Sequence, residues 1–182
     1  MRSEKHCRLS GRTFLVLLSV TLLLVLSMNL INAHLQTTAA PGGIVTLEFA
    51  GDLATVKTIL HSWQDDMFFA GLSLGLDFLF LLAYSITIAV GCLLLADRLE
   101  KRQSLAARIG RWLAGGQLLA AGLDTIENLA LVRLLAGSEA AFLPRLAAWC
   151  AAPKFLLVGL GLAYLLAAVL LLQLRRKHPV AA

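Results

Sequence analysis

Four long runs of apolar residues constrain this chain more than any other feature. They cover about residues 13–32, 67–96, 112–135 and 149–174. A helix needs about 20 apolar residues to cross the hydrocarbon core of a bilayer, and each run is long enough. Only 15% of the 182 residues are charged, against about 25% in a typical soluble domain. We therefore predict an all-α polytopic membrane protein whose four transmembrane helices form one bundle, as a single integral membrane domain over residues 1–182.

The first run follows a basic segment, MRSEKHCRLSGR, as the apolar part of a signal peptide does. However, it is longer than the stretch of about 7 to 15 residues found in signal peptides. The best cleavage site, Thr38-Ala39-Ala40, is followed directly by Pro41. We expect an uncleaved transmembrane helix.

The segment of about residues 44–66, between the first and second runs, is polar and follows a Pro-Gly-Gly breaker. Its first part, Ile44 to Ala50, alternates apolar and polar residues as a strand does, but no partner strand is visible. Asp52 is a good helix N-cap. After it, apolar residues recur at helical spacing: Leu53, Val56, Leu60 and Trp63. We predict an amphipathic helix that lies on the membrane or caps the bundle, with Trp63 at the interface; the alternative is a solvated loop helix.

Basic residues next to the apolar runs predict the orientation. Lys and Arg number four in the N-terminal tail, five between the second and third runs and three in the C-terminal tail. The other side has only Lys57, Arg133 and Arg145. The positive-inside rule then places both termini in the cytoplasm and segment 44–66 outside the cytoplasm. Four acidic residues gather on that outer side: Glu48, Asp52, Asp65 and Asp66.

Polar residues inside the runs predict a polar interior. At about 100° per residue, Asp124, Glu127 and Asn128 fall on one face of the third run, with Gln117 two turns earlier. The same spacing aligns Ser73, Asp77 and Tyr84 on the second run. A charge at the bilayer centre costs about 2.5 to 3.5 kcal/mol on insertion scales. The two polar faces should therefore turn toward each other.

The three acids, Asp77, Asp124 and Glu127, come out at similar depths, about 12 to 16 Å from the outer ends of their helices. Lys154 is the one cation near that level. The candidate binding residues are thus Asp77, Tyr84, Asp124, Glu127, Asn128 and Lys154. They are interpreted either as interhelical glue or as the lining of a pocket or proton path.

Three classes of function remain open. The first is a small transport or proton-linked binding protein that uses the buried carboxylates. The second is an intramembrane enzyme acting on a lipid or quinone-like molecule, with a carboxylate as general acid or base. The third is an accessory or structural subunit. The chain has no H-E-x-x-H, G-x-S-x-G or P-loop motif, which disfavours the enzyme most.

Metal ions, other cofactors and nucleic acid are not expected as ligands. Cys7, Cys92 and Cys150 lie far apart and show no C-x-x-C or Cys/His metal spacing. The net charge of +5 comes mainly from residues that flank the apolar runs, where topology explains them. The expected partners are membrane lipids and either a second copy of the chain or another membrane protein.

Four motifs carry a resemblance over Pro41 to Tyr164: PGGIV, LEFAG, LDFLF with Tyr84 after it, and D-x-x-E-N at residues 124–128. Together they resemble a group of small bacterial inner-membrane proteins. The resemblance implies a location in the bacterial inner membrane and implies no activity or site residue.

Overall fold

The computed structural model describes residues 11–99 and 104–177. Their secondary structure is helical, without a strand, which confirms the all-α prediction for these residues. The elements in order are α1 (Gly11–Leu35), α2 (Ile44–Glu48), α3 (Leu53–Ser62), the 3-10 turn η1 (Gln64–Asp66), α4 (Met67–Leu99), α5 (Ser104–Leu135) and α6 (Phe142–Lys177). Cys7 and five of the basic residues used for orientation lie outside the described residues: Arg2, Lys5, Arg8, Lys101 and Arg102.

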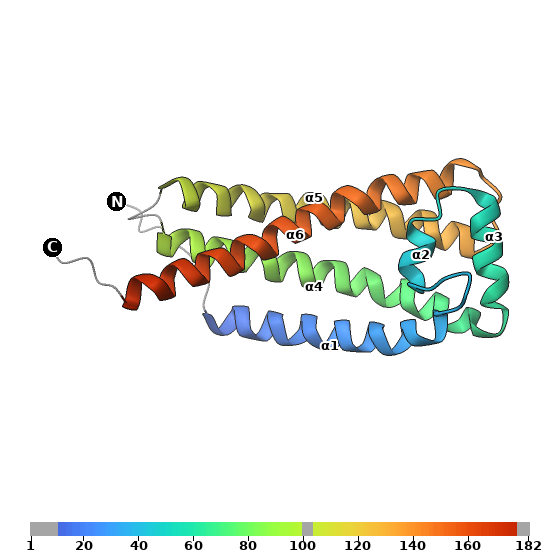
Figure 1. The fold of residues 1–182 in the computed structure, drawn as a ribbon, viewed down its shortest axis with the longest axis horizontal. Helices are drawn as coiled ribbons and strands as arrows, with labels where there is room; N and C mark the ends of the chain where they lie inside the picture. Colours follow the sequence, from blue (N-terminus) through green and yellow to red (C-terminus); the bar gives the residue numbers. More distant parts are fainter. Residues whose placement is uncertain (1–10, 100–103, 178–182) are drawn as a thin grey trace, which may run out of the picture.

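The four long helices, α1, α4, α5 and α6, lie side by side along the long axis of the molecule (Figure 1). The short helices α2 and α3 lie at one end, and α1 begins and α6 ends at the opposite end (Figure 1). α4 is the central helix, since it packs against each of the other three. An up-and-down bundle of this kind lets polar faces from several helices meet inside it.

Three stretches within the described residues are long and apolar enough to cross a membrane: Gly11–Leu35, Gln64–Leu99 and Phe142–Leu174. These are three of the four predicted spans. α5 is not among them, because polar residues interrupt its central part, including Gln117, Asp124 and Glu127. The very residues that predict a polar interior therefore lower the hydropathy of the helix that carries them.

Two of the long helices begin earlier than predicted, α5 at Ser104 and α6 at Phe142. Charged residues in these first turns resemble a loop in sequence, but they are equally compatible with the end of a helix, where side chains can point away from the bundle. Pro144 in the first turn of α6 removes no intrahelical hydrogen bond. Pro153 lies inside α6, where the missing N–H leaves one carbonyl of the preceding turn without its helical partner.

The segment Ile44 to Ala50 forms the short helix α2 and no strand. Its buried residues are Ile44, Leu47 and Glu48, which share one helical face. Asn32 at the end of α1 fixes the start of α2, since its Oδ1 accepts the Ile44 N–H at 2.8 Å. Gly43 makes the turn with a φ of 62°, a conformation that favours glycine.

α3 covers the end of the bundle. Its predicted N-cap is confirmed, because Asp52 Oδ1 accepts the Thr55 N–H at 2.9 Å. Val56 and Ile59 are buried on its inner face. The prediction that Trp63 lies at the membrane interface is wrong: its side chain is 0% exposed, and its Nε1 donates to the Leu35 carbonyl at 2.7 Å. Trp63 thus ties the cap to the end of α1.

Candidate functional site

Lys154 of α6 lies at the centre of a buried ionic cluster. Its Nζ is 2.8 Å from Asp124 Oδ1 and 2.8 Å from Glu127 Oε1, both on α5. A third carboxyl oxygen, Glu48 Oε2 of α2, is 3.7 Å away. An ammonium group has three protons, so it can serve these carboxylates together. The cluster therefore joins α2, α5 and α6 around one cation.

Two further hydrogen bonds connect the cluster to α4. The Tyr84 hydroxyl donates to Asp124 Oδ2 at 2.8 Å, so both oxygens of Asp124 are bonded. The Asn128 side-chain amide donates to Asp77 Oδ2 at 2.7 Å. All six candidate residues predicted from the sequence are buried. These contacts join Tyr84, Asp124, Glu127 and Lys154, and they join Asp77 and Asn128 as a separate pair.

Glu48 is the residue that the sequence reasoning missed. The sequence predicts only that it lies with three other acids on the outer side, and the structure shows that it is only 5% exposed and faces Lys154. The available signal was its spacing from Ile44 and Leu47, which puts it on the apolar face of a helix. The strand-like alternation of the same residues concealed that signal.

The charges of the cluster do not balance. Within the described residues, three buried carboxyl groups lie within 3.7 Å of the Lys154 ammonium, those of Glu48, Asp124 and Glu127, and a fourth, that of Asp77, lines the same cavity. Burial raises the pKa of Glu48 to about 7, while Lys154 opposes this shift and Asp77 adds to it. A carboxyl group with such a pKa exchanges its proton near neutral pH.

Glu48 and Glu127 lie beside the same cation, with Glu48 Oε2 at 3.7 Å and Glu127 Oε1 at 2.8 Å from Lys154 Nζ. Glu48 Oε2 and Glu127 Oε2 are both buried, and neither accepts a hydrogen bond from a donor among the described residues. Two buried carboxyl groups beside one cation repel each other when both are ionised, and protonation of one of them removes that repulsion. This pair is therefore a site where a proton can be held and released.

A cavity of about 470 Å³ opens beside the cluster. Its polar end is formed by Glu48, Asp77, Tyr84, Asp124 and Lys154. Its walls are mainly apolar side chains of α1, α4 and α6, among them Leu18, Val25, Phe80, Phe155, Val158 and Leu165. Small-molecule sites have this size and this combination of apolar walls with a few polar groups.

α1 forms one wall of the cavity and is tied to α4 by a hydrogen bond between two lining residues. Thr21 Oγ1 and Thr87 Oγ1 are 2.8 Å apart. Glu127 and Asn128 do not line the cavity but contact the residues that do. Five residues of the cluster therefore line the cavity, and Glu127 and Asn128 support them from behind.

Within the described residues, no group of three or more His, Cys, Asp and Glu side chains is arranged to hold a metal ion. Cys92 and Cys150 are buried free thiols. The chain matches no protein family, and neither a curated protein nor a solved structure is similar to it.

Proposed function

We propose that this protein binds an amphipathic small molecule in the cavity between α1, α4 and α6, and that binding is linked to the movement of a proton. One observation carries the proposal: a cavity of about 470 Å³ has apolar walls along its length and a carboxyl-rich cluster at one end. An amphipathic ligand would place its head at the cluster and its tail along the walls.

The proposal includes the membrane arrangement. α5 is the fourth span, supported by its position alongside the other long helices (Figure 1) and by its burial pattern. Its polar residues Gln117, Asp124 and Glu127 are buried, whereas its exposed residues include Leu118 and Leu119. The Lys/Arg asymmetry supports cytoplasmic termini and an extracytoplasmic α2 and α3, and the sequence resemblance supports the bacterial inner membrane.

The head of the ligand should carry positive charge. The polar end of the cavity offers three carboxyl groups and one ammonium, and Glu48 Oε2 is a buried acceptor without a donor partner among the described residues. A cationic head at Glu48 would replace the proton held there and keep the charge of the site unchanged. Binding would then release a proton, which is the coupling that a proton-linked transporter needs.

Melting temperatures of the purified protein in a non-ionic detergent can test this function. Dodecylammonium serves as the probe and dodecanol as the uncharged control. We expect dodecylammonium to raise the melting temperature of the wild type more than dodecanol does, because it binds the folded state at the carboxyl groups.

A pair of substitutions on α6 tests whether the rise in melting temperature comes from binding in the cavity. Val158→Trp fills the cavity, whereas Leu156→Trp lies outside its lining, with Leu156 63% exposed. The dodecylammonium shift should disappear in the first variant and persist in the second. Equal shifts with both probes, or a shift that survives in the Val158→Trp variant, would refute binding in this cavity.

A further inference from the structure

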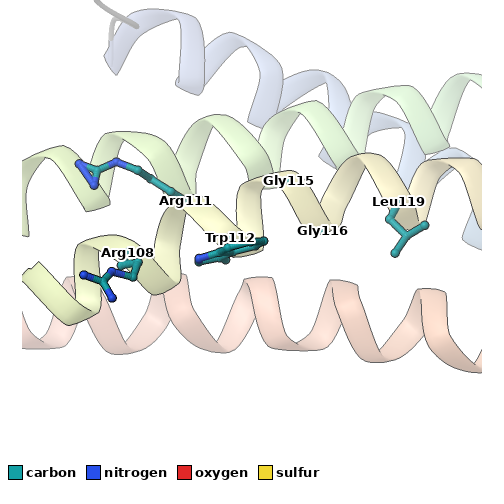
Figure 2. A pocket seen from close by; sticks show the side chains of 6 residues that line it. All are labelled: Arg108, Arg111, Trp112, Gly115, Gly116 and Leu119. Atoms are coloured by element: carbon teal, nitrogen blue, oxygen red, sulfur yellow. The ribbon is translucent and has the colours of Figure 1, made fainter.

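A second hollow of about 550 Å³ lies on α5, and its lining includes no residue of the carboxyl cluster. Its lining residues are Arg108, Arg111, Trp112, Gly115, Gly116 and Leu119 (Figure 2). Their spacing of three and four residues puts them along one face of the helix. This face starts with two guanidinium groups, continues with an indole and ends with a glycine pair and a leucine.

Along this face, the side chains change from cationic to apolar in the same order as the headgroup, interface and hydrocarbon layers of one bilayer leaflet. From Arg108 to Leu119 the helix rises by about 16 Å, roughly half of the ~30 Å hydrocarbon core. Arginine pairs with phosphate through its planar fork of donors. Trp112 is 77% exposed, and an indole with one apolar and one polar edge is typical of the membrane interface.

Gly115 and Gly116 leave room for a lipid acyl chain beside the Trp112 indole, on the side away from the arginines. A Cβ atom built on Gly115 would meet nothing within 4 Å, and one on Gly116 would meet only Leu157 Cδ2 at 3.4 Å. Leu119, 60% exposed, continues the apolar floor. The hollow is thus apolar where an acyl chain would lie and cationic where a headgroup would lie (Figure 2).

We infer that this hollow binds one anionic phospholipid, with its phosphate at Arg108 and Arg111 and an acyl chain over Gly115 and Gly116. The polar-to-apolar gradient and the charge complementarity carry the inference. A second copy of the chain fits less well, because a symmetric contact would bring arginines against arginines. A soluble phosphate would use the arginines but not the glycine hollow.

Quenching of Trp112 fluorescence by brominated lipids tests this site in the full chain. The protein is reconstituted in phosphatidylcholine bilayers that contain either brominated phosphatidylglycerol or brominated phosphatidylcholine at equal mole fraction. A Trp149→Phe background removes the other exposed indole, and Trp63 is buried. We expect phosphatidylglycerol to be preferred by about fivefold for each arginine, the factor that ~1 kcal/mol per basic residue gives.

Two variants, each with a matched control, distinguish binding of the lipid headgroup from binding of its acyl chain. Arg108→Gln should lower the preference about fivefold, whereas Arg133→Gln, at the other end of α5, should not change it. The substitution is made at Arg108 because Arg111 also interacts within the protein. Gly115→Leu should reduce quenching by phosphatidylglycerol, whereas Gly71→Leu, at an equally open glycine of α4, should not.

Four outcomes would overturn the inference. Equal quenching by both lipids would show no anionic preference, and low quenching by both would mean that a second copy covers the face. A preference that Gly115→Leu leaves intact would show diffuse attraction without a bound lipid. Loss of quenching on adding inorganic phosphate, compared with chloride at the same ionic strength, would assign the site to a soluble anion.

Discussion

At the scale of single residues, the protein places an excess of acid around one lysine inside an apolar bundle. Lys154 contacts Asp124 and Glu127 at 2.8 Å, and Glu48 approaches it from a different helix. A buried carboxylate is stable only when it is paired or protonated. The cluster is therefore sensitive both to the loss of the lysine and to pH.

Glu48→Gln should change how stability depends on pH. The pKa of Glu48 is raised from its ordinary value of 4.5 to about 7, chiefly by burial. Its protonated form stabilises the folded protein, so its favourable contribution is complete below pH 4.5 and is lost as the pH rises to about 7. Above that pH the variant should be more stable than the wild type, by about 3 kcal/mol.

Thermal unfolding in detergent across this pH range measures the effect. Glu139→Gln is the control, because Glu139 is exposed and its hydrogen bond with Lys57 lowers its pKa. The control should follow the wild type between pH 4.5 and about 7. A Glu48→Gln variant that also follows the wild type would contradict a protonated Glu48.

Lys154→Met should destabilise the protein strongly. It leaves three carboxyl groups without their cation, and breaking a buried ion pair in this way costs about 3 to 5 kcal/mol. Adding Glu127→Gln should recover part of the loss, since one of the stranded acids is removed. Denaturant unfolding of the two single variants and the double variant gives the coupling between them.

The matched control is Lys57→Met. Lys57 pairs with Glu139 at 2.6 Å, but both side chains are largely exposed. Exposed pairs contribute little, so this variant should unfold like the wild type. Equal losses of unfolding free energy in Lys57→Met and Lys154→Met would mean that burial does not explain how much the Lys154 cluster stabilises the protein.

The candidate residues of the spans could be predicted because a helical wheel and a rise per residue suffice to place them. Asp124, Glu127 and Asn128 had to share a face, and Asp77 had to lie at a similar depth. Glu48 could not be placed in the same way. Its burial depends on how Asn32 and Gly43 position a helix of five residues, which no repeat in the sequence encodes.

At the scale of elements, the short helix α2 closes one end of the cavity and carries Glu48 to the cluster. Gly43→Ala should displace it, because an added Cβ would collide with the Asn32 side chain and the φ of 62° disfavours alanine. The positive φ alone costs about 1 to 2 kcal/mol. The collision should make the total loss larger.

Gly51→Ala is the control for this prediction. Gly51 also has a positive φ, of 72°, but its added Cβ would meet only a carbonyl oxygen at 3.9 Å. Melting temperatures should fall further for Gly43→Ala than for Gly51→Ala. Similar decreases would show that the contact with Asn32 does not hold α2 in place.

Element ends were predicted where a local cap decides them and missed where tertiary packing does. Asp52 caps α3 through a contact three residues away, so its role could be predicted from sequence alone. The sequence misplaces Trp63 because a helix that lies on a membrane and a helix that caps a bundle have the same pattern of apolar residues. Only the packing of Trp63 against Leu35 distinguishes them.

At the scale of the whole molecule, the charge asymmetry predicts which end faces outward. The turn η1, which contains Asp65, directly follows α3, and Ser138 belongs to the connection between α5 and α6. This connection lies at the end that carries α3, whereas α5 begins, with Ser104, at the other end (Figure 1). In a background without native cysteines, single cysteines at the first two positions should react with a membrane-impermeant maleimide in intact cells. A cysteine at position 104 should react only after lysis, and labelling before lysis would reverse the orientation.

The cavity could not be predicted from the sequence. Its walls depend on how far α1 stands from α6 while both pack against α4, and this separation has no periodic signature. The sequence predicts which helix faces are polar. The space left between helices follows only from their three-dimensional packing.

The single ammonium at the centre of the cluster also sets an order for biosynthesis. Asp124 and Glu127 precede Lys154 in the sequence, so they leave the ribosome before it does. If α5 is the fourth span, as proposed above, the two acids lack the ammonium of Lys154 in the lipid until α6 follows, and unpaired charge is costly there. The short connection from Leu135 to Phe142 allows the two helices to enter the bilayer together as a hairpin. In this arrangement, membrane integration of α5 depends on a residue that the translocon receives later.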